Sequence, residues 1–361
     1  MKPHSLAMKR NRWILRFVAI WASVVMVAPA VGADPKVIKV GHFAPGNITF
    51  PGEGLVPNVL VMKSYIEGAS AGSLKVEIHP NAALGSVRPM IELTQAGVIQ
   101  MTIPYTSIMV PFVAEMGVTQ IPFLFKDSLE ALRVMNGPLG DELASLWLKK
   151  TGTRVLSWPE GAGFRQLYTK NKVIKSPADL KGLKIRVPEN PGLLALFSAL
   201  GAKTVTVTWT ELYTALQTGV ADGAETELAS ADATKLFEVL RTATVLNHAW
   251  NLQPVLMNEK FFQSLAPGEK TIVMRAAELG ALAQNGYNRA VEDAVIQKNI
   301  KAGVEFYYPN EKEMDQFQKT GQKAYLDTLS KSVSKEWIDK TFGAVAKARE
   351  ETAKGYQAKM K

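Results

Sequence analysis

The chain has 361 residues, a formal net charge of +9, 47% hydrophobic residues and no cysteine. The lack of cysteine excludes disulfides, thiolate metal sites and a cysteine nucleophile. A chain of this size and apolar content can form one or two domains with cores large enough to be stable without cross-links.

Residues 1–33 have the pattern of an export signal. A basic stretch precedes the apolar run Phe17 to Ala30, which is too short to span a bilayer as a mature helix. The basic residues are Lys2, Lys9, Arg10, Arg12 and Arg16. The run ends in Val31-Gly32-Ala33, with the small residues that signal peptidase requires, so we expect cleavage before Asp34. The alternative is an uncleaved N-terminal anchor.

Removal of the five basic residues in this segment lowers the formal net charge from +9 to +4. No cluster of Lys and Arg interleaved with aromatic residues stands out, so nucleic acid and membrane surfaces are not expected partners. No later apolar run of about 18 residues appears, and the mature protein is expected to be soluble and not membrane-spanning.

The first part of the mature chain alternates apolar strand patterns with helical patterns. The expected elements are a strand at Val37 to Phe43, a turn at Ala44 to Asn47, a helix at Gly54 to Glu67, a strand at Leu74 to Ile78, a helix at Val87 to Gln95 and a strand at Val98 to Ile103. This order predicts a parallel α/β sheet covered by helices.

The pattern starts again near Gly152 and predicts a second α/β unit. Its expected strands are Thr153 to Trp158, Phe164 to Tyr168, Leu183 to Val187, Thr204 to Val207 and Val220 to Ala224, and its expected helices are Pro191 to Leu200 and Trp209 to Thr218, the latter ending at Gly219.

One long helix is expected between Pro267 and Ala302, where proline is absent and apolar residues recur at helical spacing. About 35 residues at 1.5 Å per residue give a length near 50 Å, which exceeds a single small domain. We therefore expect this helix to run across both units.

The search for catalytic chemistry finds little. There is no nucleophile elbow, no phosphate-binding glycine loop and no zinc-protease motif, and the scattered residues His42, His79 and His248 do not predict a metal site. We expect no cofactor and no enzymatic activity. Asp222, Glu225 and Glu227 could act as paired carboxylates, but a turn at Gly223, with Asp222 or Thr226 capping a helix, is the favoured interpretation.

Two arginines are the strongest candidates for a binding site. Arg165 and Arg186 each lie in an apolar, strand-like segment. A guanidinium stays charged, so in a partly buried position it must meet either an internal carboxylate or an incoming anion. The spacing alone leaves a structural ion pair and a ligand clamp equally open.

Two segments resemble the substrate-binding proteins of tripartite ATP-independent periplasmic (TRAP) transporters, the DctP family. They are Ser176 to Pro188, with the sequence Lys-Ile-Arg-Val-Pro at its end, and Thr210 to Glu225. Further matches in the family's order are Leu84-Gly85, Gln95-Ala-Gly97, Ile121-Pro-Phe-Leu-Phe125 and Met257-Asn258. The resemblance covers nearly all of the mature chain.

The resemblance implies a periplasmic protein with two α/β lobes, a ligand cleft between them and a long helix spanning both. It would capture a small organic acid by its carboxylate and deliver it to membrane subunits of the transporter. The expected organisation is a signal peptide at 1–33, lobe I at 34–162 plus 252–291, lobe II at 163–251 plus 292–335, and a C-terminal helix at 336–361. The alternatives are the receptor of an ATP-driven importer and a secreted hydrolase.

The resemblance also assigns expected ligand contacts. Arg186 would bind the carboxylate through two hydrogen bonds, and Arg165 would supply a second contact. Thr226 stands where many members have an asparagine, and its shorter side chain reaches less far. Compared with sialic-acid-binding members, Phe43, Tyr105 and Trp209 predict a more aromatic pocket and a ligand with few hydroxyls, although ordinary core packing of these aromatic residues stays open.

Overall fold

The computed structural model describes residues 34–48 and 51–359, and the expected signal peptide lies outside them. The described residues from Pro35 onward belong to one compact unit. The strands are β1 (Lys36–Gly41), β2 (Leu74–His79), β3 (Met101–Thr102), β4 (Thr153–Ser157), β5 (Glu160–Thr169), β6 (Lys184–Val187), β7 (Lys203–Thr206), β8 (Gly223–Glu227), β9 (Thr242–Leu252), β10 (Val255–Asn258) and β11 (Glu305–Tyr307).

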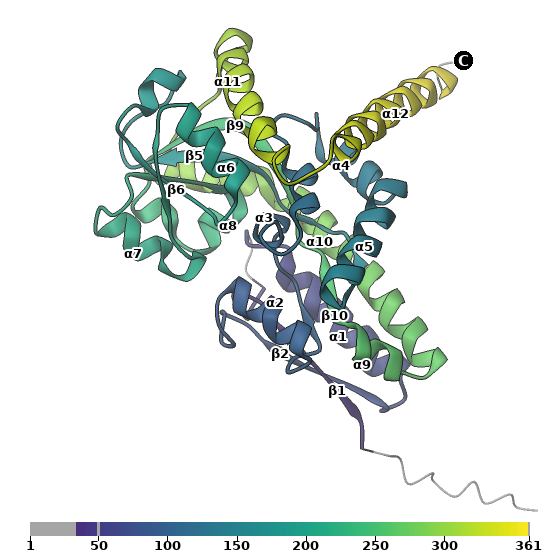
Figure 1. Ribbon diagram of the computed structural model, residues 1–361. Helices are drawn as coiled ribbons and strands as arrows, with labels where there is room; N and C mark the ends of the chain where they lie inside the picture. The colour runs from purple at the N-terminus through teal and green to yellow at the C-terminus, as the bar shows by residue number, and fades with distance from the viewer. Residues whose placement is uncertain (1–33, 49–50, 360–361) are drawn as a thin grey trace, which may run out of the picture. The chain divides into compact units, whose positions relative to one another are not determined.

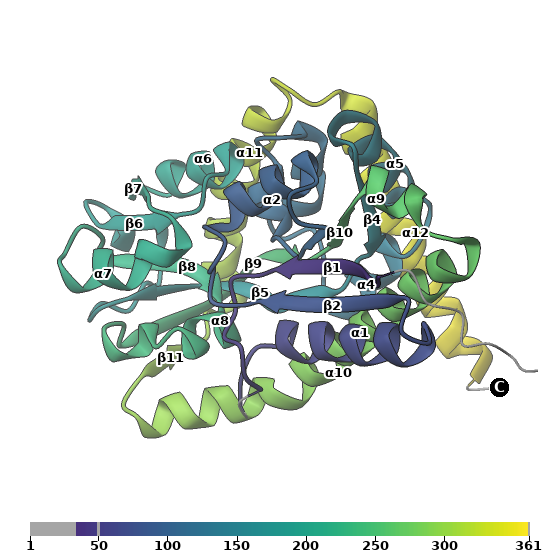
Figure 2. The ribbon, with the colours of Figure 1, turned by 90° about the horizontal axis from the view of Figure 1, so that it is seen from below.

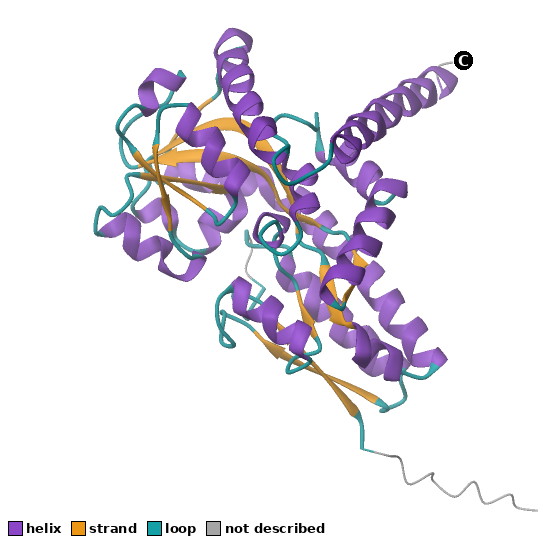
Figure 3. Cartoon of the chain, in the orientation of Figure 1, coloured by secondary structure: helices purple, strands orange, loops and turns teal. Residues whose placement is uncertain are grey.

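Helices cover both sheets, and Figure 3 distinguishes them from the strands. The α-helices are α1 (Leu55–Ala69), α2 (Val87–Ala96), α3 (Thr106–Met109), α4 (Ser128–Met135), α5 (Pro138–Thr151), α6 (Pro191–Ala199), α7 (Leu212–Gln217), α8 (Leu228–Ala233), α9 (Glu259–Ser264), α10 (Pro267–Lys301), α11 (Glu311–Leu329) and α12 (Lys335–Lys359). The short 3-10 helices are η1 (Ala114–Gln120), η2 (Pro177–Leu180), η3 (Trp209–Glu211) and η4 (Leu236–Glu238).

The strands form two sheets, as Figure 1 shows. The five-stranded sheet has the order β2-β1-β3-β10-β4, and the six-stranded sheet has the order β11-β9-β5-β8-β6-β7. This confirms the expected α/β class, with the strands divided between two sheets. The parallel sheet expected for the first part of the chain is confirmed, because β1 pairs parallel with β2 and β3. The sheets are mixed overall, since β10 pairs antiparallel with β3 and β4, and β5 pairs antiparallel with β8 and β9.

The expected long helix is confirmed as α10, which has 35 residues. It packs against α1 and β4 beside the five-stranded sheet and against α8 beside the six-stranded sheet, and Figure 2 shows it next to α1. The approach to α1 is close because Gly280 has no side chain, and a Cβ there would clash with Asn58. A buried hydrogen bond from Asn58 Nδ2 to Gln284 Oε1, 2.6 Å long, joins the same two helices.

The segment after β6 is fixed by helix capping. The side chain of Asn190 accepts hydrogen bonds from the backbone N–H groups of Gly192 (3.0 Å) and Leu193 (3.1 Å), and Pro191 fills the first helical position of α6. The chain therefore turns at a defined point directly after β6. This places Pro188 and Glu189 beside the end of the strand that contains Arg186.

The C-terminal helix α12 packs against α4. Arg349 of α12 donates hydrogen bonds to both carboxylate oxygens of Glu130, at 2.9 and 3.0 Å, and to the carbonyl oxygen of Leu124 at 2.9 Å. No helix among the described residues is both long enough and apolar enough to cross a membrane.

Candidate functional site

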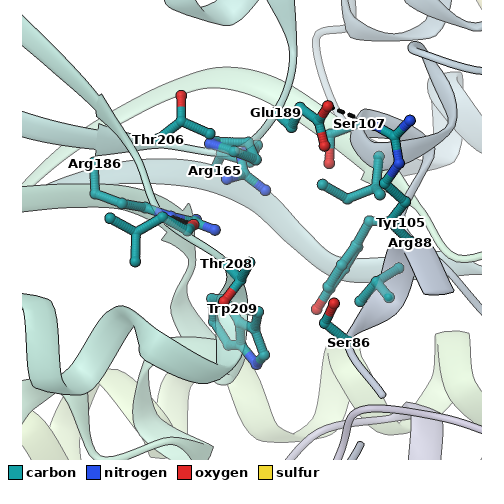
Figure 4. A pocket seen from close by; sticks show the side chains of 14 residues that line it. Ser86, Arg88, Tyr105, Ser107, Arg165, Arg186, Glu189, Thr206, Thr208 and Trp209 are labelled. Carbon is teal, nitrogen blue, oxygen red and sulfur yellow. Dashed lines mark hydrogen bonds and ion pairs between the residues drawn. The ribbon is translucent and has the colours of Figure 1, made fainter. Parts of the chain in front are cut away.

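A cavity lies between elements of the two sheets and encloses an empty volume of about 640 Å³, part of which is open to solvent (Figure 4). Its walls come from the N-terminal end of α2, from α3, and from β5, β6 and the segment that follows β7. The lining residues are Ser86, Val87, Arg88, Tyr105, Ser107, Ile108, Arg165, Arg186, Pro188, Glu189, Thr206, Val207, Thr208 and Trp209. The cavity therefore brings together both expected arginines and two of the three expected aromatic residues.

Arg186 is positioned by β6, which lies next to the edge strand β7 of the six-stranded sheet. It stands opposite Val205 of β7 and Ala224 of β8, and only 3% of its surface is exposed. Its Nε donates a hydrogen bond to the carbonyl oxygen of Val207 at 2.9 Å. Within residues 34–48 and 51–359, no carboxylate lies close enough to form an ion pair with it.

The surroundings of Arg186 are unfavourable for its charge. Burial lowers the pKa of its guanidinium to about 10; the charge of Arg165 acts in the same direction, and the more distant carboxylates of Glu225 and Glu227 oppose it. A guanidinium has five N–H donors, and one of those of Arg186 is used by Val207. The two Nη groups therefore remain available for two parallel hydrogen bonds to a carboxylate.

Arg165 lies in a different environment, although it also lines the cavity. Its Nε and Nη2 donate hydrogen bonds to the two carboxylate oxygens of Glu225 at 2.5 and 2.8 Å, and its Nη1 donates to Glu227 Oε1 at 2.7 Å. Burial alone would lower the pKa of Arg165, but the two carboxylates outweigh it and raise the pKa. Arg165 therefore forms a structural ion pair, and a second Nη2 hydrogen bond to the Glu225 carbonyl leaves only one N–H unused.

The two glutamates belong to β8, and here the expected turn was wrong. The segment Gly223–Glu227 is a strand that pairs with β5, and Arg165 stands opposite Glu227. Asp222 accepts a hydrogen bond from the backbone N–H of Lys184 at 2.9 Å and does not cap a helix. The strand tolerates two buried carboxylates because Arg165 supplies a counter-charge to both. Hydrogen bonds of His248 with Glu225 (3.1 Å) and from Asn251 Nδ2 to Glu227 (2.7 Å) add to this.

The expected contact residue Thr226 lies between these glutamates. It is 1% exposed, stands opposite Gln166 of β5, and donates a hydrogen bond to Glu227 Oε2 at 2.9 Å. It is not among the residues that line the cavity. Its side chain supports the ion-pair cluster behind Arg165.

The three expected aromatic residues lie next to one another. The ring of Phe43 is 4.9 Å from the ring of Tyr105 and 6.3 Å from the ring of Trp209, measured between centroids. Tyr105 and Trp209 line the cavity of Arg186, and Phe43 and Trp209 line a neighbouring one. The guanidinium carbon of Arg186 lies 5.9 Å from the centre of the Trp209 ring, within cation–π range.

A buried carboxyl group, which the sequence did not indicate, supports Tyr105. The Tyr105 hydroxyl donates a hydrogen bond to Glu53 Oε1 at 2.9 Å and lies 2.7 Å from the hydroxyl of Ser230. Gln253 Nε2 also donates to Glu53, at 3.0 Å. Burial raises the pKa of Glu53 to about 7, although its hydrogen bonds act in the opposite direction. The Tyr105 hydroxyl is thus held by Glu53, which precedes α1, and by Ser230 of α8, which are far apart in the sequence.

An ion pair that the sequence did not indicate lies at the cavity wall. Nη1 of Arg88 donates a hydrogen bond to Glu189 Oε1 at 2.5 Å. Arg88 follows the Leu84-Gly85 motif, and Glu189 follows Pro188 of the Lys-Ile-Arg-Val-Pro segment. The neighbouring motifs could have pointed to these two residues. Charged residues are usually exposed, however, so their types alone did not indicate that they pair. In the described part of the chain, no group of three or more His, Cys, Asp or Glu residues could hold a metal ion.

The chain is similar in sequence to bacterial solute-binding proteins. Residues 51–332 match the family model DctP, "Bacterial extracellular solute-binding protein, family 7". A solute-binding protein of Verminephrobacter eiseniae is 35% identical over 216 residues, which are 60% of this chain and 64% of that protein. The C4-dicarboxylate-binding periplasmic protein DctP of Rhodobacter capsulatus is 30% identical over 78% of this chain and 82% of its own length.

Solved structures show the same fold. A TRAP periplasmic solute-binding protein of Bordetella bronchispeptica, with density assigned to pantoate, is 30% identical, covers 85% of this chain and 98% of its own, and superposes with a TM-score of 0.78. The sugar-acid-binding protein DctPAm of Advenella mimigardefordensis, in complex with galactonate, is 26% identical, covers 87% and 99%, and has a TM-score of 0.82. The chain therefore belongs to the DctP family of bacterial extracellular solute-binding proteins, the binding components of TRAP transporters.

Proposed function

We propose that the protein is a periplasmic receptor that captures one small organic acid by its carboxylate at Arg186 and delivers it to the membrane permease of a TRAP transporter. The relatives named above bind dicarboxylates, pantoate or galactonate, and these ligands share a carboxylate. The family of this chain consists of binding proteins, and we expect it to hold its ligand without converting it.

The observation that supports this most strongly is the state of Arg186. A guanidinium that is 3% exposed, bonded to one neutral carbonyl oxygen and lacking an acidic partner among the described residues is energetically costly to maintain. An incoming carboxylate would provide a directly contacting counter-charge and two charge-assisted hydrogen bonds. Arg165 cannot serve equally well, because Glu225 and Glu227 already neutralise it.

The walls of the cavity favour a ligand body with few hydroxyls. Its apolar surface comes from Val87, Ile108, Pro188, Val207 and Trp209. The Tyr105 hydroxyl, which would suit a ligand hydroxyl, is already engaged with Glu53 and Ser230. Burial of an apolar ligand surface against these residues would add to the affinity from the carboxylate.

The lobes that close on this ligand would be residues 34–162 plus 252–291 and residues 163–251 plus 292–335, followed by the helix at 336–361. The chain passes between the two sheets from β4 to β5 and from β9 to β10, and α10 packs beside both, so a hinge motion would bend the chain at these places. Closure would bury the ligand and mark the receptor as loaded for the permease.

Periplasmic localisation agrees with the family and with the sequence of residues 1–33. We propose that signal peptidase cleaves before Asp34. N-terminal sequencing of the exported protein tests the site directly, and recovery of residues 1–33 in a membrane fraction would contradict it.

Ligand capture is tested by mass spectrometry of the compound released from the purified protein on denaturation, followed by calorimetric titration. Arg186→Ala and Arg186→Lys should weaken binding by roughly 30-fold or more. Alanine removes the charge, and lysine keeps the charge but lacks the planar guanidinium that donates two parallel hydrogen bonds. Arg275→Ala, which removes an exposed arginine outside the cavity, is the matched control. Binding within about threefold of wild type by a folded Arg186→Ala protein would show that this assignment is wrong.

A further inference from the structure

The charges along the cavity wall are distributed unevenly around Arg88. This guanidinium is shared by two carboxylates, since Nη1 donates to Glu189 Oε1 at 2.5 Å and Nε donates to Glu92 Oε1 at 3.2 Å. Arg88 and Glu189 line the cavity, whereas Glu92 does not. With two negative charges and one positive charge, this group has a formal net charge of −1.

Arg186 and Arg88 lie on opposite sides of the cavity in Figure 4. On the side of Arg186, the buried charges are Arg165 and Arg186 against Glu225 and Glu227, which cancel formally. The Arg186 side is formally neutral and can accept one carboxylate through its unused Nη donors. The Arg88 side has a formal charge of −1 and repels a second one.

We infer that the site selects ligands with one carboxylate over dicarboxylates, because Glu189 occupies the Arg88 guanidinium on the cavity side and repels a second negative group. The inference rests on the function proposed above, in which Arg186 binds the first carboxylate. Glu189 is therefore a specificity-determining residue that acts by excluding one class of ligand. Such exclusion by a like charge is a common means of discrimination between similar partners.

The other residues that line the cavity support the same conclusion. Val87, Ile108 and Val207 contribute apolar surface, and the hydroxyls of Ser86 and Ser107 are neutral. A charged group held against such surface would lose hydration without gaining an opposite charge. A methyl or methylene end would lose nothing, so the preferred ligand has a charged head at Arg186 and an uncharged tail.

A dicarboxylate could enter only if Arg88 exchanged Glu189 for the ligand. The pair is half exposed, with 44% of the Arg88 side chain and 50% of the Glu189 side chain accessible, so Glu189 could move into solvent. That exchange replaces one ion pair with another, so it adds little to the free energy of binding. Glu189 would also remain at the rim of the cavity, close enough to repel the new carboxylate. Because the two side chains are exposed, the discrimination should weaken as salt concentration rises.

The test compares matched acids that differ by one methyl-to-carboxylate change: butanoate with succinate, hexanoate with adipate, and 2-hydroxybutanoate with malate. Dissociation constants are measured by ligand-observed NMR titration for wild type, Glu189→Gln, Glu92→Gln and Arg186→Ala. We expect wild type to bind the monocarboxylates about tenfold more tightly than their dicarboxylate partners. Glu189→Gln should reduce this ratio to near one by freeing Arg88 on the cavity side.

Glu92→Gln is the matched control, because it removes a carboxylate from the same guanidinium but outside the cavity. It should change the ratio by less than about threefold. Tighter binding of the dicarboxylates by wild type, or equal ratios in Glu189→Gln and wild type, would overturn the inference while leaving carboxylate capture intact. If no acid of any pair binds and denaturation releases no carboxylate, the proposed function itself fails.

Discussion

Arg165 and Glu225 are joined by two hydrogen bonds that use both carboxylate oxygens, at 2.5 and 2.8 Å, in an environment where the side chains are 3% and 0% exposed. Burial alone would raise the pKa of Glu225, but Arg165 and His248 outweigh it and lower the pKa. The pair fixes one wall of the cavity next to an arginine that has no such partner. The first two predictions follow from this difference.

Arg165→Ala should lower the free energy of unfolding by about 3–5 kcal/mol, because it leaves Glu225 and Glu227 buried without their counter-charge. Urea denaturation at neutral pH measures the change. Lys323→Ala, which removes an ion pair with a 75% exposed lysine, should stay within about 0.5 kcal/mol of wild type. A loss below about 1 kcal/mol in Arg165→Ala would contradict the structural role.

Arg186→Met should behave in the opposite way in the absence of ligand. The substitution replaces a buried, unpaired charge with an apolar side chain and sacrifices one hydrogen bond to Val207, so the unbound protein should be as stable as wild type or more stable. Carboxylate binding should be lost in the same variant. Thermal melts with and without ligand measure both effects, and a marked drop in the melting temperature of the unbound variant would argue that Arg186 maintains the fold.

The stability of the protein should depend on the protonation of Glu53. Burial raises its pKa to about 7, above the value of about 4.5 in the unfolded chain, so the folded state binds more protons between these values. Its contribution is therefore complete below pH 4.5 and is lost as pH rises towards 7. Glu53→Gln should remove this decline, which amounts to about 3 kcal/mol at most.

The effect of Glu53 must be measured as a difference between two proteins, because His42 also makes the stability depend on pH. Burial lowers its pKa to about 4 from 6.5, so its contribution increases as pH rises between these values and opposes that of Glu53. Unfolding free energies from pH 5 to 8 should be compared between wild type and Glu53→Gln at each pH. Parallel curves for the two proteins would show that Glu53 does not titrate in this range.

Trp209 should report ligand binding through its fluorescence, because it lines the cavity and faces Arg186 at 5.9 Å. Addition of a carboxylate should change the emission of wild type, and Trp209→Phe should lose most of that change. Trp209→Ala should also weaken binding by removing apolar contact surface. Trp337→Phe, a change in α12 outside the cavity, should keep the full response. An unchanged response in Trp209→Phe would place the ligand elsewhere.

The regular elements were largely predictable from the sequence, and α10 is the clearest case. Its apolar residues recur without proline over the full length, and the structure begins the helix at Pro267 as expected. The strand β8 was placed three residues too early because Gly223 and the polar residues that follow it indicated a turn and a helix cap. Their partner Arg165 is 60 residues away in the sequence, so local patterns could not reveal the neutralisation.

Within the candidate site, the residues that lie in recognisable motifs could be predicted from the sequence, and the others could not. Arg186 was identified from its apolar strand and the Lys-Ile-Arg-Val-Pro segment, and the structure places it in the cavity wall. The expected second contact, Arg165, could not be separated from an ion pair, since that distinction depends on which side chains lie opposite in β8. Glu53, Arg88 and Glu189 were missed because each acquires its role from partners that are distant in the chain.

The position of β10 constrains the order in which the chain can fold during synthesis. This strand lies between β3 and β4 and pairs with both, although it follows them by about a hundred residues or more. A nascent chain that ends at residue 250 would leave two strand edges of the first sheet open. The first sheet is therefore completed only after most of the second has been synthesised, and unfinished chains have open strand edges that favour edge-to-edge association.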